Sequence, residues 1–95
     1  MTLDSVVLPS KGQVSCELEG EAALLHLEAG MYYGLDEVGA SVWKLIQKKI
    51  SIRQIRDAVL EQYDTTPSVC EKDLFSLLKS LEKYDLVEIR LGKAA

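Results

Sequence analysis

The first third of the chain alternates between apolar and polar residues, a pattern typical of strands that bury one face. The stretch 13–28, QVSCELEGEAALLHLE, is interrupted at Gly20, and a further glycine, Gly30, precedes MYYGL. Glycines at these points indicate tight connections between neighbouring strands. The pattern therefore predicts a three-stranded antiparallel meander with strands near 13–19, 22–28 and 31–35.

The period of the apolar residues changes at Asp36. An aspartate there can cap a helix, because its carboxylate accepts from the free N–H groups of the first turn. Gly34, just before it, is expected to ease the backbone at this junction. The apolar residues that follow at helical spacing are Val38, Val42, Leu45 and Ile46. They predict a helix over about 37–48, with Trp43 on its flank.

Two further helix starts follow after short connections. Ser51 and Gln54 form a capping box that opens a helix ending near 63. Thr66 and Pro67 give an N-cap followed by proline at the first helical position, which opens a third helix. The apolar stripe of the second helix is Ile52, Ile55, Val59 and Tyr63, and that of the third is Cys70, Leu74, Leu77, Leu78 and Leu81.

Two short extended segments flank this pattern. VVL at 6–8, stopped by Pro9, adds a short strand or lies along the sheet, and YDLVEIRL at 84–91 leaves the third helix as a last extended segment. Together the segments predict an α+β fold, a winged helix-turn-helix with an N-terminal three-stranded antiparallel sheet followed by three helices. No linker or repeat divides the chain, so residues 1–95 are expected to form a single domain.

Composition narrows the classes of function. The chain has 95 residues, of which 47% are hydrophobic and 27% charged, and its apolar runs are too short to cross a bilayer. Asp4 and the lack of a basic segment argue against a secretory signal, so we expect a cytoplasmic protein. The net charge of −4 disfavours nucleic acid as a partner, because binding to phosphates relies on lysine and arginine.

Few residues offer catalytic or metal-binding chemistry. Cys16 and Cys70 lack metal-ligand spacing, and His26 is the only histidine. We interpret the cysteines as small buried hydrophobes, and His26 as an outward-facing or hydrogen-bonded strand residue. No glycine-rich phosphate loop is present. We therefore expect no enzyme activity, cofactor or metal; a hydrolase combining one cysteine with His26 is the weaker alternative.

The third predicted strand suggests binding instead. MYYGL contains neither proline nor charge, so it lacks the features that usually prevent an edge strand from pairing with another chain. The third helix could form the other wall of a groove. Either border of its stripe qualifies, and the two are Val69, Asp73, Leu77 and Ser80 on one side and Glu71, Phe75, Leu78 and Glu82 on the other.

Three runs resemble the PqqD-like family of recognition elements for ribosomally synthesised and post-translationally modified peptides. They are YYGLDEVGASVWKLI at 32–46, SIRQIRDAVLEQYD at 51–64 and DLFSLLKSLEKYDLV at 73–87. The resemblance implies that a leader peptide adds as an antiparallel strand to the third strand, with its apolar side chains in a cleft against the third helix. Carried over to this chain, the peptide-binding residues are Met31, Tyr32, Tyr33, Gly34, Leu35, Val69, Cys70, Asp73, Leu74 and Leu77.

The resemblance also implies partners. Relatives are often fused to large modifying enzymes, whereas 95 residues hold only the recognition part. In a lasso-peptide cluster, the favoured setting, the partners are the precursor peptide, a separate cysteine-type leader protease and an ATP-dependent cyclase. The alternatives are delivery of a precursor to a radical SAM enzyme in quinone-cofactor biosynthesis, and a DNA-binding winged helix.

The chain departs from the family pattern at one position. Asp85 stands where family members often have a glycine that ends the third helix.

Overall fold

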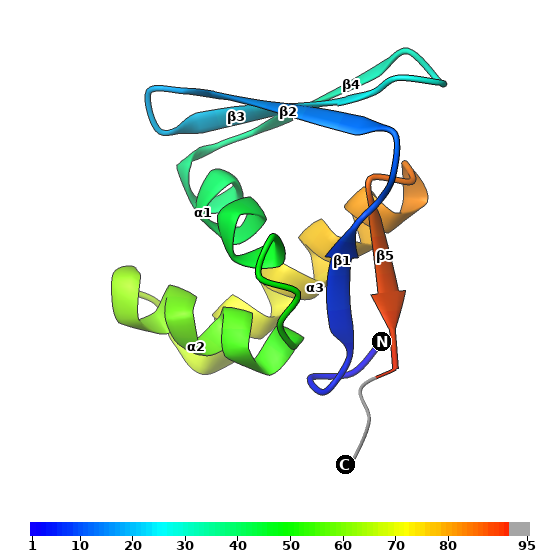
Figure 1. The fold of residues 1–95 in the computed structure, drawn as a ribbon. Coiled ribbons are helices and arrows are strands. Elements are labelled where there is room, and N and C mark those ends of the chain that lie inside the picture. The colour runs from blue at the N-terminus through cyan, green and yellow to red at the C-terminus, as the bar shows by residue number, and fades with distance from the viewer. Residues whose placement is uncertain (92–95) are drawn as a thin grey trace.

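The structure is a computed structural model that describes residues 1–91 and has an α+β fold (Figure 1). Its elements in chain order are β1 Val6–Pro9, β2 Gln13–Leu18, β3 Glu21–His26, β4 Met31–Leu35, α1 Glu37–Ile46, α2 Ile52–Gln62, α3 Pro67–Lys83 and β5 Val87–Arg90. The predicted order of strands and helices is confirmed. The predicted limits differ by one to three residues at several ends: α1 ends at Ile46 rather than near 48, and the last extended segment begins as β5 at Val87 rather than at 84.

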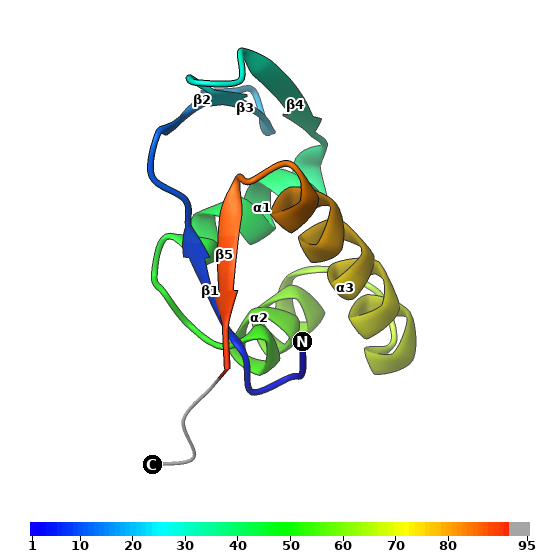
Figure 2. The ribbon, with the colours of Figure 1, turned by 90° about the vertical axis from the view of Figure 1, so that its right-hand side faces the viewer.

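The strands form two separate antiparallel sheets. The predicted meander is a sheet of order β2-β3-β4, and the two flanking segments pair with each other as β1 and β5. Figures 1 and 2 show the three-stranded sheet on one side of the helices, with the β1 and β5 pair beside them. The sequence pattern showed both short segments as extended but did not reveal that they pair. The winged helix-turn-helix assignment stays a prediction.

The core lies where the helices meet the inner face of the three-stranded sheet and the β1 and β5 pair. Its least exposed side chains come from every layer and include Leu24, Ile46, Ile52, Ile55, Leu78, Leu81, Val7 and Val87. Trp43 was expected on the flank of its helix, which is wrong, since only 2% of it is exposed. Burial of these apolar side chains is the main favourable term for folding.

Cys16 corrects a second expectation. It is exposed, not buried, while Cys70 is buried as predicted. Successive residues of a strand point to opposite faces of the sheet, and Cys16 pairs with Ala23 on the face that no helix covers. The outer face therefore carries Cys16, together with the row Val14, Leu25 and Tyr32, whose exposed fractions are 49%, 39% and 71%.

All three predicted helix starts are confirmed. Asp36 accepts from the N–H of Gly39 over 2.8 Å, and the capping box of Ser51 and Gln54 forms in both directions. Thr66 accepts from the N–H of Val69 over 3.3 Å. Each cap satisfies donors that a helix leaves unpaired in its first turn, so these local signals fix where α1, α2 and α3 begin.

The end of α3 shows how the helix closes with Asp85 in the place where family members often have a glycine. Its φ is 58°, so this aspartate takes the left-handed conformation that glycine usually supplies at a helix end. The N–H of Leu86 donates to the C=O of Leu81 over 2.9 Å, and that of Asp85 to the C=O of Glu82 over 3.0 Å. This is the hydrogen-bond pattern of a Schellman motif, built without glycine.

None of the helices within residues 1–91 combines the length and the hydropathy needed to span a membrane.

Candidate functional site

The outer edge of β4 presents backbone groups that β3 does not use. The N–H of Leu27 donates to the C=O of Gly12 over 2.9 Å, so odd-numbered residues of β3 are in hydrogen-bonded pairs with β2. The even-numbered residues then bond to β4. The pairs between the two strands are Ala22 with Leu35, Leu24 with Tyr33 and His26 with Met31. The backbone N–H and C=O groups of Tyr32 and Gly34 therefore point away from the sheet.

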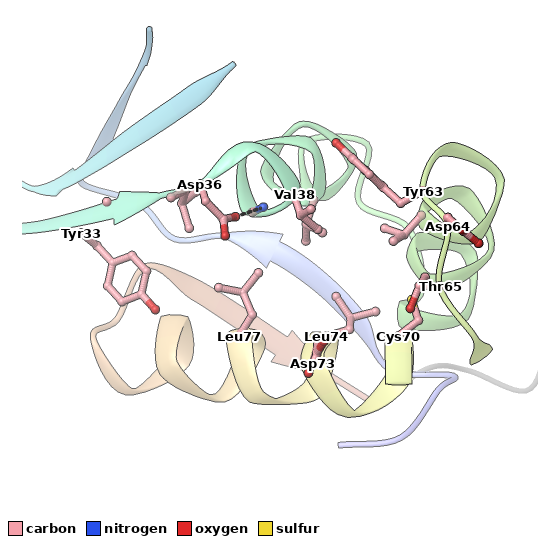
Figure 3. Close-up of a pocket in the computed structure, with 15 residues that line it drawn as sticks. Tyr33, Asp36, Val38, Tyr63, Asp64, Thr65, Cys70, Asp73, Leu74 and Leu77 are labelled. Carbon is pink, nitrogen blue, oxygen red and sulfur yellow. Dashed lines mark hydrogen bonds between the residues drawn. The ribbon is translucent and has the colours of Figure 1, made fainter. Parts of the chain in front are cut away.

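A groove of about 640 Å³ lies beside this edge (Figure 3). One wall is the junction from β4 into α1, the other is α3, and the groove reaches the connection between α2 and α3. Its apolar lining combines buried residues with the partly exposed Val38 and Leu77. The buried apolar residues that line it are Leu35, Val42, Val59, Cys70 and Leu74. An open strand edge beside an apolar cleft is the geometry that strand addition requires.

The structure brings seven of the ten predicted contact residues into this groove. They are Tyr33, Gly34, Leu35, Cys70, Asp73, Leu74 and Leu77. Met31 and Tyr32 belong to β4 but do not line the groove, and Val69 lies one turn before Asp73 with 51% of it exposed. The border of α3 that faces the groove is thus the one with Asp73 and Leu77. Phe75, on the other border, packs against the core.

Several lining residues were not predicted as part of the site. Val38 and Val42 come from α1, and Tyr63, Asp64 and Thr65 come from the end of α2 and the segment after it. The apolar repeat of α1 identified both valines, but only as core residues. The sequence did indicate that Val38 could belong to the site, because it stands two residues after the N-cap Asp36 and therefore close to the end of β4.

The two tyrosines of the YYG run point to opposite faces. Tyr33 lies over α3, where its ring is 5.8 Å from that of Tyr84, centroid to centroid. Tyr32 is on the outer face with 71% exposed. Gly34 was expected to ease the backbone, but its φ is not in the left-handed region, and an added Cβ would meet only the Tyr32 ring, at 3.8 Å or beyond. That expectation is wrong for Gly34.

The cysteines and the histidine are not brought together as a catalytic pair. His26 is 7% exposed; its Nδ1 accepts from the N–H of Ala29 over 3.1 Å, and its Nε2 is 3.2 Å from Oδ2 of Asp85. The first bond assigns the proton to Nε2, which then donates to the carboxylate. His26 is therefore a hydrogen-bonded structural residue that ties β3 to the end of α3.

Cys70 lines the groove as a buried residue, and its surroundings disfavour the thiolate form. Burial raises the pKa of its thiol, and the neighbouring carboxylates of Glu71 and Asp73 act in the same direction, against the guanidinium of Arg56. A buried thiol of this kind is a poor nucleophile. Across residues 1–91 no cluster of three or more potential metal ligands is present.

Arg56 joins the two helices at the far end of the groove. Its Nη1 donates to Glu71 over 2.6 Å and its Nε and Nη2 to Asp57 over 3.0 and 2.9 Å. These hydrogen bonds, first that to Glu71 and then that to Asp57, raise the pKa of the guanidinium. The ion pair with Glu71 connects α2 to α3 and so helps to hold the helices that close the groove.

Most of the chain matches one known protein family. Residues 21–87 match the family described as Coenzyme PQQ synthesis protein D (PqqD). The chain belongs to the PqqD family. The matched range contains β4, all three helices and every residue that lines the groove.

A solved structure is similar over nearly the whole chain. It is described as TbiB1 in complex with the TbiA(beta) leader peptide, with 34% sequence identity and a TM-score of 0.81. The alignment covers 93% of this chain and 99% of that one. The comparison with curated proteins found no match. The PqqD-family fold of this chain is thus shared with a protein solved together with a leader peptide.

Proposed function

We propose that this PqqD-family chain binds the leader segment of a ribosomal precursor peptide by strand addition to β4. The observation that carries the proposal is the outward-facing backbone of Tyr32 and Gly34 beside an apolar groove against α3. Main-chain pairing would supply affinity, and the side-chain pockets would supply specificity. The similar TbiB1 structure contains a leader peptide, which supports the same class of ligand here.

The register of the added strand follows from the free backbone groups. A peptide residue opposite Tyr32 or Gly34 forms the hydrogen-bonded pair, and cross-strand partners share a face of the sheet. Residues opposite Tyr33 and Leu35 would then direct their side chains toward α3 and into the groove. We expect these two peptide positions to be apolar, because they meet Leu77 and Leu74. Val69 would extend the same border for a longer peptide.

Partner proteins are part of the same proposal. We propose that the bound precursor is delivered to a separate cysteine-type leader protease and an ATP-dependent cyclase in lasso-peptide maturation. The likeness to TbiB1 favours recognition of a leader peptide. The family description favours the second candidate, delivery of a precursor to a radical SAM enzyme in quinone-cofactor biosynthesis. In both settings the chain would act as one winged helix-turn-helix recognition domain over residues 1–95, in the cytoplasm, and would itself be non-catalytic.

Calorimetric titration tests the proposal directly. The ligand is a synthetic peptide with the leader half of a precursor encoded beside the gene, and we expect a Kd in the sub-micromolar to micromolar range, about −8 to −10 kcal/mol. A lack of binding at tens of micromolar would overturn the proposal. The proposal also requires that the peptide binds in the groove, and a pair of matched variants tests this.

Val38→Gln and Val14→Gln form that matched pair. Both valines are partly exposed, at 40% and 49%, but Val38 lines the groove whereas Val14 lies on the outer face of the sheet. Loss of the apolar contact should lower the affinity of Val38→Gln by roughly 1 kcal/mol, about fivefold. Val14→Gln should bind as the parent chain does. Equal affinities for both variants would place the peptide elsewhere.

A further inference from the structure

The groove has acidic side chains at its rim and, within the described part of the chain, no lysine or arginine among its lining residues. The three acidic residues are Asp36, Asp64 and Asp73. In Figure 3, Asp73 lies beside Leu74 on α3, and Asp64 lies near Tyr63 and Thr65, at the far end of the groove from Tyr33. A ligand in the groove therefore meets negative charge at the end near α2.

The three carboxylates differ in how much of their charge is offset. Asp36 accepts from the N–H of Gly39 and sits at the positive end of the α1 dipole. Asp64 and Asp73 are exposed, and neither takes part in the ion pairs formed among residues 1–91. These two carboxylates are available to a cation carried by the ligand.

The direction of the added strand decides which part of the ligand reaches them. β4 runs from Met31 toward Asp36 and α1, so a strand antiparallel to it runs the opposite way. Its residues before the position opposite Leu35 would extend beyond β4, along the groove toward Asp73 and Asp64 (Figure 3). The N-terminal part of such a strand would thus pass the two carboxylates.

We propose that the groove selects an extended peptide with a lysine or arginine on the N-terminal side of its apolar anchor residues, paired with Asp64 and Asp73. The inference rests on the proposed function and specifies its ligand. An exposed ion pair typically changes affinity by roughly 1.5- to 5-fold, so two of them together give about 2- to 25-fold. Salt screens exposed pairs, so the preference is largest at low ionic strength.

Selection from a random peptide library tests the inference without knowledge of the natural precursor. An mRNA-displayed library of random 12-residue peptides is selected on the parent chain and, in parallel, on the double variant Asp64→Asn/Asp73→Asn. We expect the parent chain to enrich lysine or arginine two to four positions before an apolar-x-apolar pair. The double variant should enrich the apolar pair alone.

The control is the double variant Glu21→Gln/Glu82→Gln. It also removes two negative charges, from exposed residues that do not line the groove. It should select the same basic position as the parent chain. A preference for basic residues that weakens equally in both double variants would reflect the net charge of the molecule and would overturn the inference.

Binding measurements with an enriched peptide then give the contribution of its basic residue to the affinity. Exchange of its lysine or arginine for glutamine should weaken binding to the parent chain about 2- to 25-fold at low salt, and by less than that to Asp64→Asn/Asp73→Asn. Apolar peptides without an enriched basic position would refute the inference and leave the proposed function standing. A library that yields no binding peptide at all would count against both.

Discussion

Asp85 takes a backbone conformation that most residues avoid. Its positive φ ends α3, and its carboxylate also accepts from Nε2 of His26 in β3. Aspartate tolerates the left-handed region better than most side chains, although not as well as glycine. The residue therefore combines two roles, since it closes the helix and joins the helix end to the three-stranded sheet.

Replacement of Asp85 separates these roles. Asp85→Gly keeps the favourable backbone but leaves the donor of His26 without its partner, whereas Asp85→Ala loses both. We expect Asp85→Ala to be less stable than Asp85→Gly by about 1 kcal/mol, the cost of a left-handed non-glycine residue. Urea denaturation followed by circular dichroism measures the difference. Asp85→Asn, which keeps an acceptor, is the control, and equal stability of the alanine and glycine variants would refute the strain argument.

The two cysteines should differ in reactivity. Cys16 is exposed, whereas Cys70 is buried. Burial raises the pKa of the Cys70 thiol, so a smaller fraction of it is thiolate than for a cysteine with an ordinary pKa. We expect iodoacetamide to modify Cys16 first and Cys70 more slowly, on the order of tenfold or more. A higher pH should speed the reaction of Cys70. Mass spectrometry of digested samples assigns the rates, with the urea-unfolded chain as the control in which both react alike.

Within β4, the backbone groups of alternate residues face opposite edges of the strand. The N–H of Tyr33 faces β3, whereas that of Tyr32 faces outward, where a peptide strand would bind. Residue identity does not predict this difference, because the two tyrosines are adjacent and alike. It follows from the position of the turn between β3 and β4, which sets the parity of hydrogen-bonded pairs.

Proline substitutions can test which backbone N–H groups of β4 face outward. Tyr32→Pro removes an outward donor, and an edge strand tolerates proline there; Tyr33→Pro removes a donor that pairs with Leu24. We expect Tyr32→Pro to lower leader affinity by about 0.5–1.5 kcal/mol relative to Tyr32→Ala, and Tyr33→Pro to be the less stable of the two proline variants. Calorimetry and thermal melts measure these effects. Equal affinities of Tyr32→Pro and Tyr32→Ala would argue against strand addition at this edge.

At the scale of the whole molecule, the arrangement leaves one sheet edge and one groove side by side. The helices lie on one side of the three-stranded sheet, and the β1 and β5 pair lies beside them (Figure 2). The same order of helices motivated the DNA-binding alternative. Lys72, Lys79 and Lys83 on α3 are exposed, yet the chain as a whole is acidic. Its charge is better suited to a cationic peptide than to a phosphate backbone.

Local sequence patterns are sufficient to predict the elements and the residues at which the helices begin. Alternation, turn glycines and the caps at Asp36, Ser51 and Thr66 are local signals, because each depends on residues within one or two turns. They predicted the order of strands and helices, and the resemblance pointed to β4 and α3 as the walls of the site. Most of the predicted contact residues line the groove for this reason.

The contacts between distant segments, in contrast, are visible only in the folded chain. The pairing of β1 with β5, the burial of Trp43, the exposure of Cys16 and the bond between His26 and Asp85 depend on contacts between residues far apart in the chain. The same holds for the part of the groove formed by Val38, Asp64 and Thr65. No local pattern encodes such contacts, since they form when helices pack on a sheet and bury a shared apolar surface.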